Sequence, residues 1–419
     1  MAERQSRAIT FAAPPAVTGS PFTSPLPGAP CATGEAGSAS RNRAQMSLAD
    51  RPAQHQARTS GSPEQPPAQF PLVLGIDTFG DLVYGDNAQP LSHAETIRSV
   101  VEQGVLADRI GVDFFGIGEH HTNEFPMPAA DVVLAAIAAR TSRIRLGSAV
   151  TVLSSDDPVR VFQRYSTLNA ISSGRAEVIL GRGSSIESFP LFGYDLADYE
   201  QLFEEKTGLF AKLMNGGPVS WQGTTRAALH DQDVVPHLES GPFPVWIGVG
   251  GSPESVIRAA RYGFSLMLAI IGGRPDRFRS FSSLFEQALE DAGQPPRPVG
   301  VHAPGHVAGT DGQAQADFWP TWYAAISRVA RERGFRPPTK ESFAFDVGPE
   351  GALYVGSPET VATKIVANLH SLRASRFDLK LGMPGLTHDQ VMGAIELYGA
   401  QVIPRVRELH SARSRESAR

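Results

Sequence analysis

The sequence predicts an α/β protein, specifically a (β/α)8 TIM barrel with insertions. Eight short apolar runs alternate with longer helical stretches from residue 71 onward. The runs are continuous rather than alternating, which is typical of parallel strands buried on both faces. No Gly-x-Gly-x-x-Gly turn follows the first run, so the rival doubly wound open sheet is disfavoured. The expected strands are 71–77, 113–118, 144–150, 175–181, 244–249, 264–269, 299–306 and 376–381.

A helical stretch follows each expected strand, as in a (β/α)8 barrel. Two longer excursions, 214–243 and 333–356, interrupt this alternation with turn residues. Long excursions in a compact domain are usually lids, binding loops or contact surfaces, so both are expected to edge the pocket or a dimer surface. The expected helices are 92–109, 127–140, 158–171, 197–213, 252–261, 274–292, 311–332, 357–372 and 388–407.

The expected barrel spans residues 71–405 and has a tail on each side. Residues 1–70 are rich in Pro, Ala, Ser and Gly without a strand or helix period, so they are predicted to be disordered. A mis-assigned start, with Met46 as the true first residue, is one explanation of this extension, and a transit peptide is the alternative. Residues 406–419 form a charged C-terminal tail that is expected to fray.

Composition argues against several kinds of partner. The 419 residues carry a formal net charge of -5, and no segment supplies the basic face that a nucleic acid requires. The single cysteine, Cys31, permits neither a disulfide framework nor a thiolate metal site. No run of about 18 apolar residues and no secretory signal pattern occurs, so a cytoplasmic protein without a membrane partner is expected.

Three ionisable side chains, Glu119, His120 and His121, follow the apolar strand 113–118. The carboxyl end of a barrel strand is where catalytic groups are carried, so these three are candidate catalytic residues. A histidine at that place can hydrogen-bond an oxygen of a cofactor or substrate, or transfer a proton near neutral pH.

Two other interpretations of the histidines stay open. Either of them could be a structural histidine with its hydrogen bonds satisfied in the core. A zinc site would need a third and a fourth ligand, for which Glu119, Glu124, His302 and His306 are available in principle. The usual helical spacing of zinc-binding histidines is absent, so no metal is assigned.

A glycine turn after the fifth strand is the best candidate for binding an anion. Gly250 and Gly251 let the backbone approach a ligand closely, and Ser252 with Pro253 is a typical helix start that leaves N–H groups free. Ser255 lies in the same first turn and joins the candidate set. A plain helix cap is the alternative interpretation.

Further candidates stand at other strand ends. Arg182, between Gly181 and Gly183, could bind a phosphate or carboxylate through two parallel hydrogen bonds, or could form a surface salt bridge. Asp77 ends the first strand and Thr151 follows the third. Both are included among the candidate cofactor-binding residues.

These strand-end residues, in this order, resemble the bacterial luciferase-like family of flavin-dependent monooxygenases. The resemblance covers roughly residues 71–405. It is carried by GEHHTNEF at 118–125, by the segment from IRLGSAVTVLSSDDPVRVF to GRG at 144–183, and by GVGGSPESV at 248–256. Each motif is weak alone, but three in register at matching strand ends form a strong match.

The resemblance implies a (β/α)8 barrel and a set of site roles. His120 would lie beside the flavin and aid the oxygen chemistry. A non-proline cis peptide is expected near Val150 to Leu153. The flavin phosphate would be held by Arg182, Gly250, Gly251, Ser252 and Ser255.

The activity implied by the resemblance is oxygenation of a small organic substrate by reduced FMN and O2 through a C4a-(hydro)peroxyflavin. A separate flavin reductase would supply the reduced flavin, and a homodimer is expected. Segments 79–91 and 303–356 do not resemble the luciferase pocket, so light emission from a fatty aldehyde is not expected. An aldehyde, a ketone, or an electron-rich carbon or heteroatom would suit the reaction.

Three alternatives remain. The first is a deazaflavin-dependent oxidoreductase that transfers hydride on the same barrel. Its cofactor has a longer acidic tail, and Arg258 and Arg261 near the glycine turn keep it open. The second is a flavin-binding protein without catalysis, and the third is a zinc hydrolase.

Overall fold

The computed structural model describes residues 70–417, apart from Asp86, Ala88, residues 184–186, Ser240 and Phe335. The expected disordered extension, which ends at residue 70, therefore lies almost entirely outside the described residues. No helix in the described part of the chain is both long enough and apolar enough to cross a membrane.

Eight parallel strands close into a barrel, which confirms the predicted fold class. Each strand pairs with the next in chain order, and the last returns to the first through pairs such as Gly75 with Asp378. A two-residue strand, β4 (Thr151–Val152), continues the line of β3. The barrel strands are β1 (Val73–Thr78), β2 (Phe114–Ile117), β3 (Arg145–Ser148), β5 (Ala176–Gly181), β8 (Val245–Val249), β9 (Ser265–Ala269), β10 (Val299–Val307) and β12 (Arg376–Lys380).

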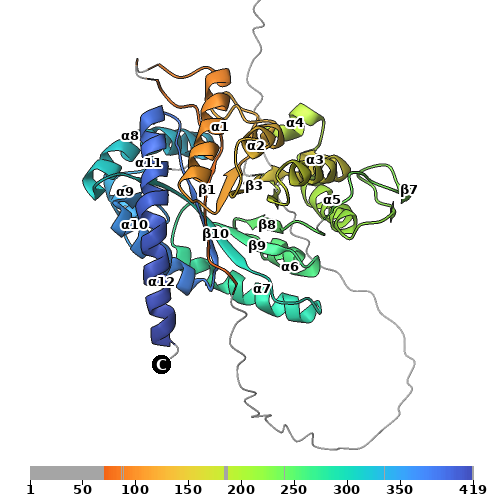
Figure 1. The fold of residues 1–419 in the computed structure, drawn as a ribbon. Coiled ribbons are helices and arrows are strands. Elements are labelled where there is room, and N and C mark those ends of the chain that lie inside the picture. Colours follow the sequence, from red (N-terminus) through yellow and green to blue (C-terminus); the bar gives the residue numbers. More distant parts are fainter. Residues whose placement is uncertain are drawn as a thin grey trace, which may run out of the picture. The chain divides into compact units, whose positions relative to one another are not determined.

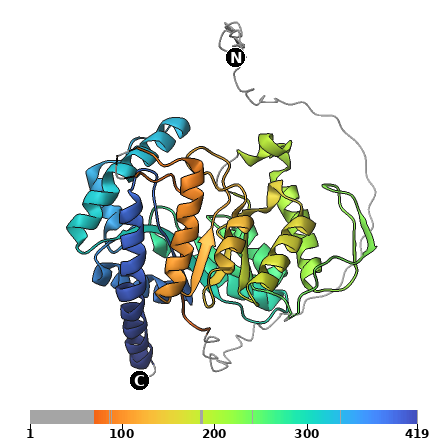
Figure 2. The same ribbon diagram turned by 45° about the horizontal axis from the view of Figure 1, so that its top comes forward.

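Helices pack around the outside of these strands (Figures 1 and 2). Several of them begin at a residue whose side chain caps the helix, as at the expected Ser252, which accepts a hydrogen bond from the N–H of Ser255. The helices are α1 (His93–Arg109), α2 (Ala130–Ala138), α3 (Pro158–Ile171), α4 (Ser188–Phe192), α5 (Tyr199–Met214), α6 (Pro253–Arg261), α7 (Arg279–Asp291), α8 (Asp311–Arg333), α9 (Lys340–Val347), α10 (Pro358–Ser371), α11 (His388–Leu397) and α12 (Ile403–Ser417).

The two excursions hold secondary structure of their own. Segment 214–243 forms an antiparallel hairpin of β6 (Val219–Trp221) and β7 (Leu229–Gln232). This hairpin lies at the outer edge of the barrel unit in both views (Figures 1 and 2). Segment 333–356 contains α9 and the short strand β11 (Tyr354–Gly356), which pairs with the far end of β10.

The ammonium group of Lys364 holds the second excursion against α10. Its Nζ lies 2.5 Å from the carbonyl oxygen of Gly348 and 2.7 Å from that of Leu353. The carbonyls of Asp346 and Val347 lie at 3.2 and 3.3 Å. Burial lowers the pKa of Lys364 to about 8, so the cationic form still predominates at neutral pH.

The prediction that residues 406–419 fray is wrong as far as Ser417, because α12 continues to that residue. Val406 is fully buried. Arg405 donates to Glu359 at 2.8 Å, and Arg407 donates to Asp113 at 2.8 Å. Ion pairs to other elements therefore anchor the start of α12, although the charged composition of this part of the chain predicted disorder.

A buried charged cluster fills the amino end of the barrel interior. Arg376 is 1% exposed and donates to both oxygens of Asp378 and to Glu177. Its guanidinium lies over the rings of Phe114 and Trp246, at 3.9 and 4.6 Å from their centroids. This cluster separates the interior at the carboxyl end from a second cavity at the amino end, which Arg145, Glu177 and Arg376 themselves line.

Replacing Lys364 by methionine is expected to lower the free energy of unfolding by about 2–4 kcal/mol, because buried carbonyl oxygens lose their donor. Urea unfolding measures this loss. The matched control is Lys340→Met, which removes an exposed lysine of α9 and is expected to change stability by less than about 0.5 kcal/mol. Equal losses in the two variants would contradict the role of the Lys364 ammonium.

Candidate active site

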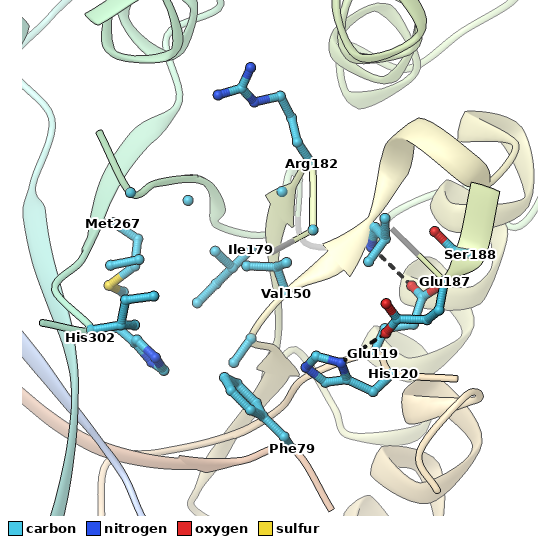
Figure 3. Close-up of a pocket in the computed structure, with 18 of the residues that line it drawn as sticks. Phe79, Glu119, His120, Val150, Ile179, Arg182, Glu187, Ser188, Met267 and His302 are labelled. Carbon is cyan, nitrogen blue, oxygen red and sulfur yellow. Dashed lines mark hydrogen bonds and ion pairs between the residues drawn. The ribbon is translucent and has the colours of Figure 1, made fainter. Parts of the chain in front are cut away.

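A cavity of about 500 Å³ opens at the carboxyl end of the barrel. This volume suits a small organic ligand, for which sites of roughly 300–1,000 Å³ are usual. We call the part lined by Phe79, Ile179, Met267 and His302 the inner end. Figure 3 shows Arg182 well away from the inner end. The candidate residues that line the cavity are Glu119, His120, His121, Arg182, Gly250, Gly251 and Ser252.

His120 is placed by the chain immediately after β2. Its N–H donates to the carbonyl of Met127, and its Nδ1 lies 3.2 Å from Oε1 of Glu187. Phe79 and Phe125 flank the ring, with centroids at 4.9 and 5.0 Å. A carboxylate at Nδ1 favours the tautomer with its proton on that nitrogen, which leaves Nε2 as the atom available to a bound molecule.

Glu119 and His121 are engaged mainly with protein atoms. Glu119 Oε1 lies 3.0 Å from His121 Nε2, while Oε2 accepts the N–H of Val152 at 2.9 Å. The N–H of Glu119 donates to the carbonyl of Val150. Glu119 thus ties the end of β2 to the chain after β3, so its arrangement suits a positioning role better than a catalytic one.

The expected non-proline cis peptide is confirmed at the bond between Ala149 and Val150, where β3 ends. Both residues line the cavity.

The end of the cavity opposite His120 combines a cation with a glycine turn. A side chain added at Gly250 or Gly251 would meet no atom within 4 Å, so the space before the first turn of α6 is open. The Arg182 guanidinium pairs with Glu200 and lies 4.9 Å from the ring centroid of Tyr199. Open N–H groups at a helix start, beside an arginine, form a suitable binding site for a phosphate.

The neighbouring cations of α6 are already engaged by carboxylates. Arg258 is buried, and it donates to Glu204 at 2.6 Å and to Glu200 at 3.4 Å. Arg261 donates to the other oxygen of Glu204 at 2.9 Å. These pairs leave Arg182 as the arginine that faces the cavity among the described residues.

Three candidates lie outside the cavity lining. Ser255 is buried in α6, where its Oγ accepts a hydrogen bond from Arg258 at 3.3 Å. The Oγ1 of Thr151 lies 3.1 Å from the hydroxyl of Tyr165, beside a smaller separate cavity. Asp77 lies behind the cavity wall, where its carboxylate is 2.8 Å from Nδ1 of a histidine.

That histidine is His302, which sequence reasoning considered only as a possible metal ligand. The expected strand end instead pointed to His306. β10 runs on to Val307 to pair with β11, so the cavity level is reached at His302, which is in register with Ala269 of β9. His306 is buried and its ring stacks on Phe318. The expected strand, 299–306, has nearly the observed length, but a continuous apolar run does not show which of its residues lies at the level of the cavity.

The two excursions were expected to edge either the pocket or a dimer surface, and in the described residues they do not edge this pocket. Neither 214–243 nor 333–356 supplies a lining residue of this cavity. Instead the chain after β5 folds into the short helix α4 beside the cavity. The lining residues from this part of the chain are Glu187, Ser188 and Tyr199. Whether the excursions form a dimer surface stays a prediction.

No group of three or more His, Cys, Asp or Glu side chains that could hold a metal ion occurs among the described residues. His302 is paired with Asp77, and His306 lies 3.4 Å from Asp317. The zinc alternative therefore has no ligand set in this part of the chain.

Comparison with known proteins adds an independent finding. The sequence model of the family described as luciferase-like monooxygenase matches residues 78–376. The chain is 26% identical to limonene 1,2-monooxygenase of Rhodococcus erythropolis over 306 residues, which cover 69% of this chain and 77% of that enzyme.

Two solved structures share the fold. One is the oxygenating constituent of 3,6-diketocamphane monooxygenase from Pseudomonas putida, a type II Baeyer-Villiger monooxygenase in complex with FMN. Its TM-score is 0.65 at 18% identity, and the match covers 80% of this chain and 98% of that one. The other is the coenzyme F420 dependent tetrahydromethanopterin reductase of Methanopyrus kandleri, with a TM-score of 0.58 at 19% identity over 80% of this chain and 100% of that one.

The family match extends over most of the chain and includes the residues that line the cavity from Phe79 to His302. The chain therefore belongs to the luciferase-like monooxygenase family of oxidoreductases.

Proposed function

We propose that the protein is a flavin-dependent monooxygenase that uses reduced FMN and O2 to oxygenate a small organic molecule. The observation that carries this proposal is a single cavity with a phosphate-suited end at Arg182 and Gly250 and a histidine, His120, at the other end. The apolar side chains of Val150 and Ile179 line the wall between them, as a flat ring system requires.

The engaged arginines favour FMN over a deazaflavin. Solved structures with this fold include one in complex with FMN and one dependent on coenzyme F420, so the fold serves both cofactors. A longer acidic tail would need cations in addition to Arg182. Arg258 and Arg261, the cations nearest the glycine turn, are instead committed to Glu200 and Glu204.

The chain's own groups have two tasks in this reaction. Reduced flavin, when bound, would supply the two electrons that a monooxygenase needs, so that one oxygen atom of O2 enters the substrate and the other becomes water. Apolar walls at Phe79, Ile179 and Met267 exclude water from the reacting centre. His120, held at Nδ1 by Glu187, would accept or return a proton at Nε2.

The proposal also includes O2, a small-molecule substrate and a separate reductase as partners. The homodimer remains a prediction. Exposed apolar side chains on neighbouring helices support it, since Val132 of α2 is 65% exposed and Ile171 of α3 is 49% exposed beside one shallow groove.

Anaerobic titration of the purified protein with reduced FMN is expected to show saturable binding, followed by flavin reoxidation slower than in free solution once O2 is admitted. Flavin absorbance measures both steps. Binding of a reduced deazaflavin with no binding of FMN would replace this proposal by the hydride-transfer alternative. Binding of reduced FMN with reoxidation as fast as in free solution would point to a flavin-binding protein without catalysis.

Replacing His120 by alanine is expected to leave the affinity for reduced FMN within about threefold and to speed release of hydrogen peroxide at least about tenfold. The reason is that no imidazole then controls the proton beside the reacting centre. A peroxide assay after mixing with O2 measures the rate, with His230→Ala, an exposed histidine of β7, as matched control. An unchanged rate would remove His120 from the mechanism.

Replacing Arg182 by alanine is expected to weaken FMN about tenfold or more and riboflavin by less than about twofold, because only FMN carries a phosphate. Fluorescence titration with each flavin measures the two affinities. Arg261→Ala is the control, since its guanidinium is paired with Glu204 and lies outside the cavity lining. Equal losses for FMN and riboflavin would exclude a phosphate contact.

A further inference from the structure

The inner end of the cavity contains one polar side chain that the proposed mechanism does not use. His302 is 8% exposed, and its Nδ1 lies 2.8 Å from Oδ2 of Asp77. Its Nε2 has no hydrogen-bond partner among the described residues. Figure 3 shows His302 beyond Phe79 from His120, with Met267 beside it.

Asp77 is a buried carboxylate with a single side-chain partner. It is 1% exposed, and its Oδ1 has no hydrogen-bond partner. An ionised carboxylate in such a place is costly unless a cation balances it. We call Asp77 and His302 the dyad.

The other buried charges near the dyad are balanced among themselves. Asp378 and Asp81 each accept a hydrogen bond from a cation of β12. A third carboxylate, Glu177, pairs both with Arg376 of β12 and with an arginine of β3. Among the described residues no buried cation is left over for the dyad, so the charge of Asp77 is cancelled only when the imidazole is protonated. The pairs are Arg376 with Asp378, Arg145 with Glu177, and Lys380 with Asp81.

The pKa of His302 is consistent with this charge balance. Burial alone would lower it, but the charge and hydrogen bond of Asp77, together with the charge of Asp378, raise it above its ordinary value. Lys380 of β12 opposes this rise. His120 lies farther away, beyond the ring of Phe79.

An imidazolium at the inner end would be a directed donor among apolar groups. The surrounding lining side chains, Phe79, Met267 and Ala269, offer its Nε2–H no oxygen or nitrogen acceptor, and the thioether sulfur of Met267 is only a weak one. A molecule that reaches this place must therefore bring an oxygen to Nε2 or leave a charged donor unpaired.

We propose that His302, held by Asp77, is a substrate-binding residue whose Nε2–H donates to a carbonyl or carboxylate oxygen of the substrate. The proposal rests on the proposed function and narrows its substrate class to apolar molecules with such an oxygen. A cationic donor also stabilises negative charge that develops on a carbonyl oxygen when the carbonyl carbon is attacked. Terpene-like hydrocarbons without oxygen would not use this donor.

Benzoate is the probe for this site, because it combines an apolar ring with a carboxylate. Calorimetric titration of the full chain, with and without saturating oxidised FMN, is expected to show saturable binding in both cases. His302→Gln keeps a neutral donor and is expected to weaken benzoate at least about tenfold. The matched control is His306→Gln, on the same strand and also beside a carboxylate, which is expected to bind benzoate as the unaltered protein does.

Protonation is measured separately by the nitrogen chemical shifts of the histidine rings as pH is raised. The resonance of His302 is identified by its loss in His302→Gln. In the unaltered protein its pKa is expected to lie above the ordinary histidine value. In Asp77→Asn the pKa of His302 is expected to be lower than in the unaltered protein. Because the folded pKa is raised, benzoate affinity is expected to persist to higher pH than an ordinary histidine would allow and to fall as pH rises through that pKa. This readout does not depend on flavin or on turnover.

Several outcomes would overturn the proposal. Benzoate that fails to bind the unaltered protein, or binds His302→Gln equally well, would exclude a donor site. FMN that displaces benzoate, combined with weaker FMN binding in His302→Gln, would assign the donor to a flavin carbonyl instead of the substrate. The proposed function fails on a different result, the absence of reduced-FMN binding, so the two failures are distinguishable.

Discussion

The guanidinium of Arg376 determines how deep a ligand can enter this barrel. It lies over the rings of Phe114 and Trp246 and forms ion pairs with Asp378 and Glu177, in a space that most barrels fill with branched apolar side chains. Removing one member of such a network leaves an uncompensated buried charge. The network therefore closes the amino end and leaves the carboxyl end as the place for chemistry.

At that carboxyl end the same design occurs twice. His120 and His302 each have Nδ1 beside a carboxylate, and each leaves Nε2 without a partner among the described residues. The surroundings differ, because Asp77 is fully buried whereas Glu187 lies at the cavity edge with a side chain 23% exposed. The buried carboxylate of Asp77 raises the pKa of His302 and so favours its charged form, while Glu187 holds Nδ1 of His120 and leaves Nε2 to a bound molecule. Two histidines on either side of Phe79 can therefore serve two roles, binding and proton transfer.

The sequence predicted the parts of the site that depend on strand order alone. Glu119, His120, Arg182 and Gly250 follow strands whose ends are marked by a change from apolar to polar residues, and all four line the cavity. His302 escaped this reasoning because β10 continues past the cavity level to pair with β11.

Ion pairs between distant segments were also beyond prediction. The sequence showed Arg258 and Arg261 near the glycine turn, but their commitment to acids of α5 depends on how α5 packs in three dimensions. The helical end of the chain, as far as Ser417, depends in the same way on Asp113 and Glu359.

The pairing of Arg182 with Glu200 bears on how a phosphate could be accepted. The Glu200 side chain is 59% exposed, so its ion pair with Arg182 is of the surface kind, worth only about 0–1 kcal/mol. A phosphate at the glycine turn would offer Arg182 two charge-assisted hydrogen bonds plus the N–H groups at the start of α6. Glu200 can turn toward water at little cost, while the ring of Tyr199 still orients the guanidinium. An acidic partner at the mouth thus keeps the arginine in place without preventing the exchange that ligand binding requires.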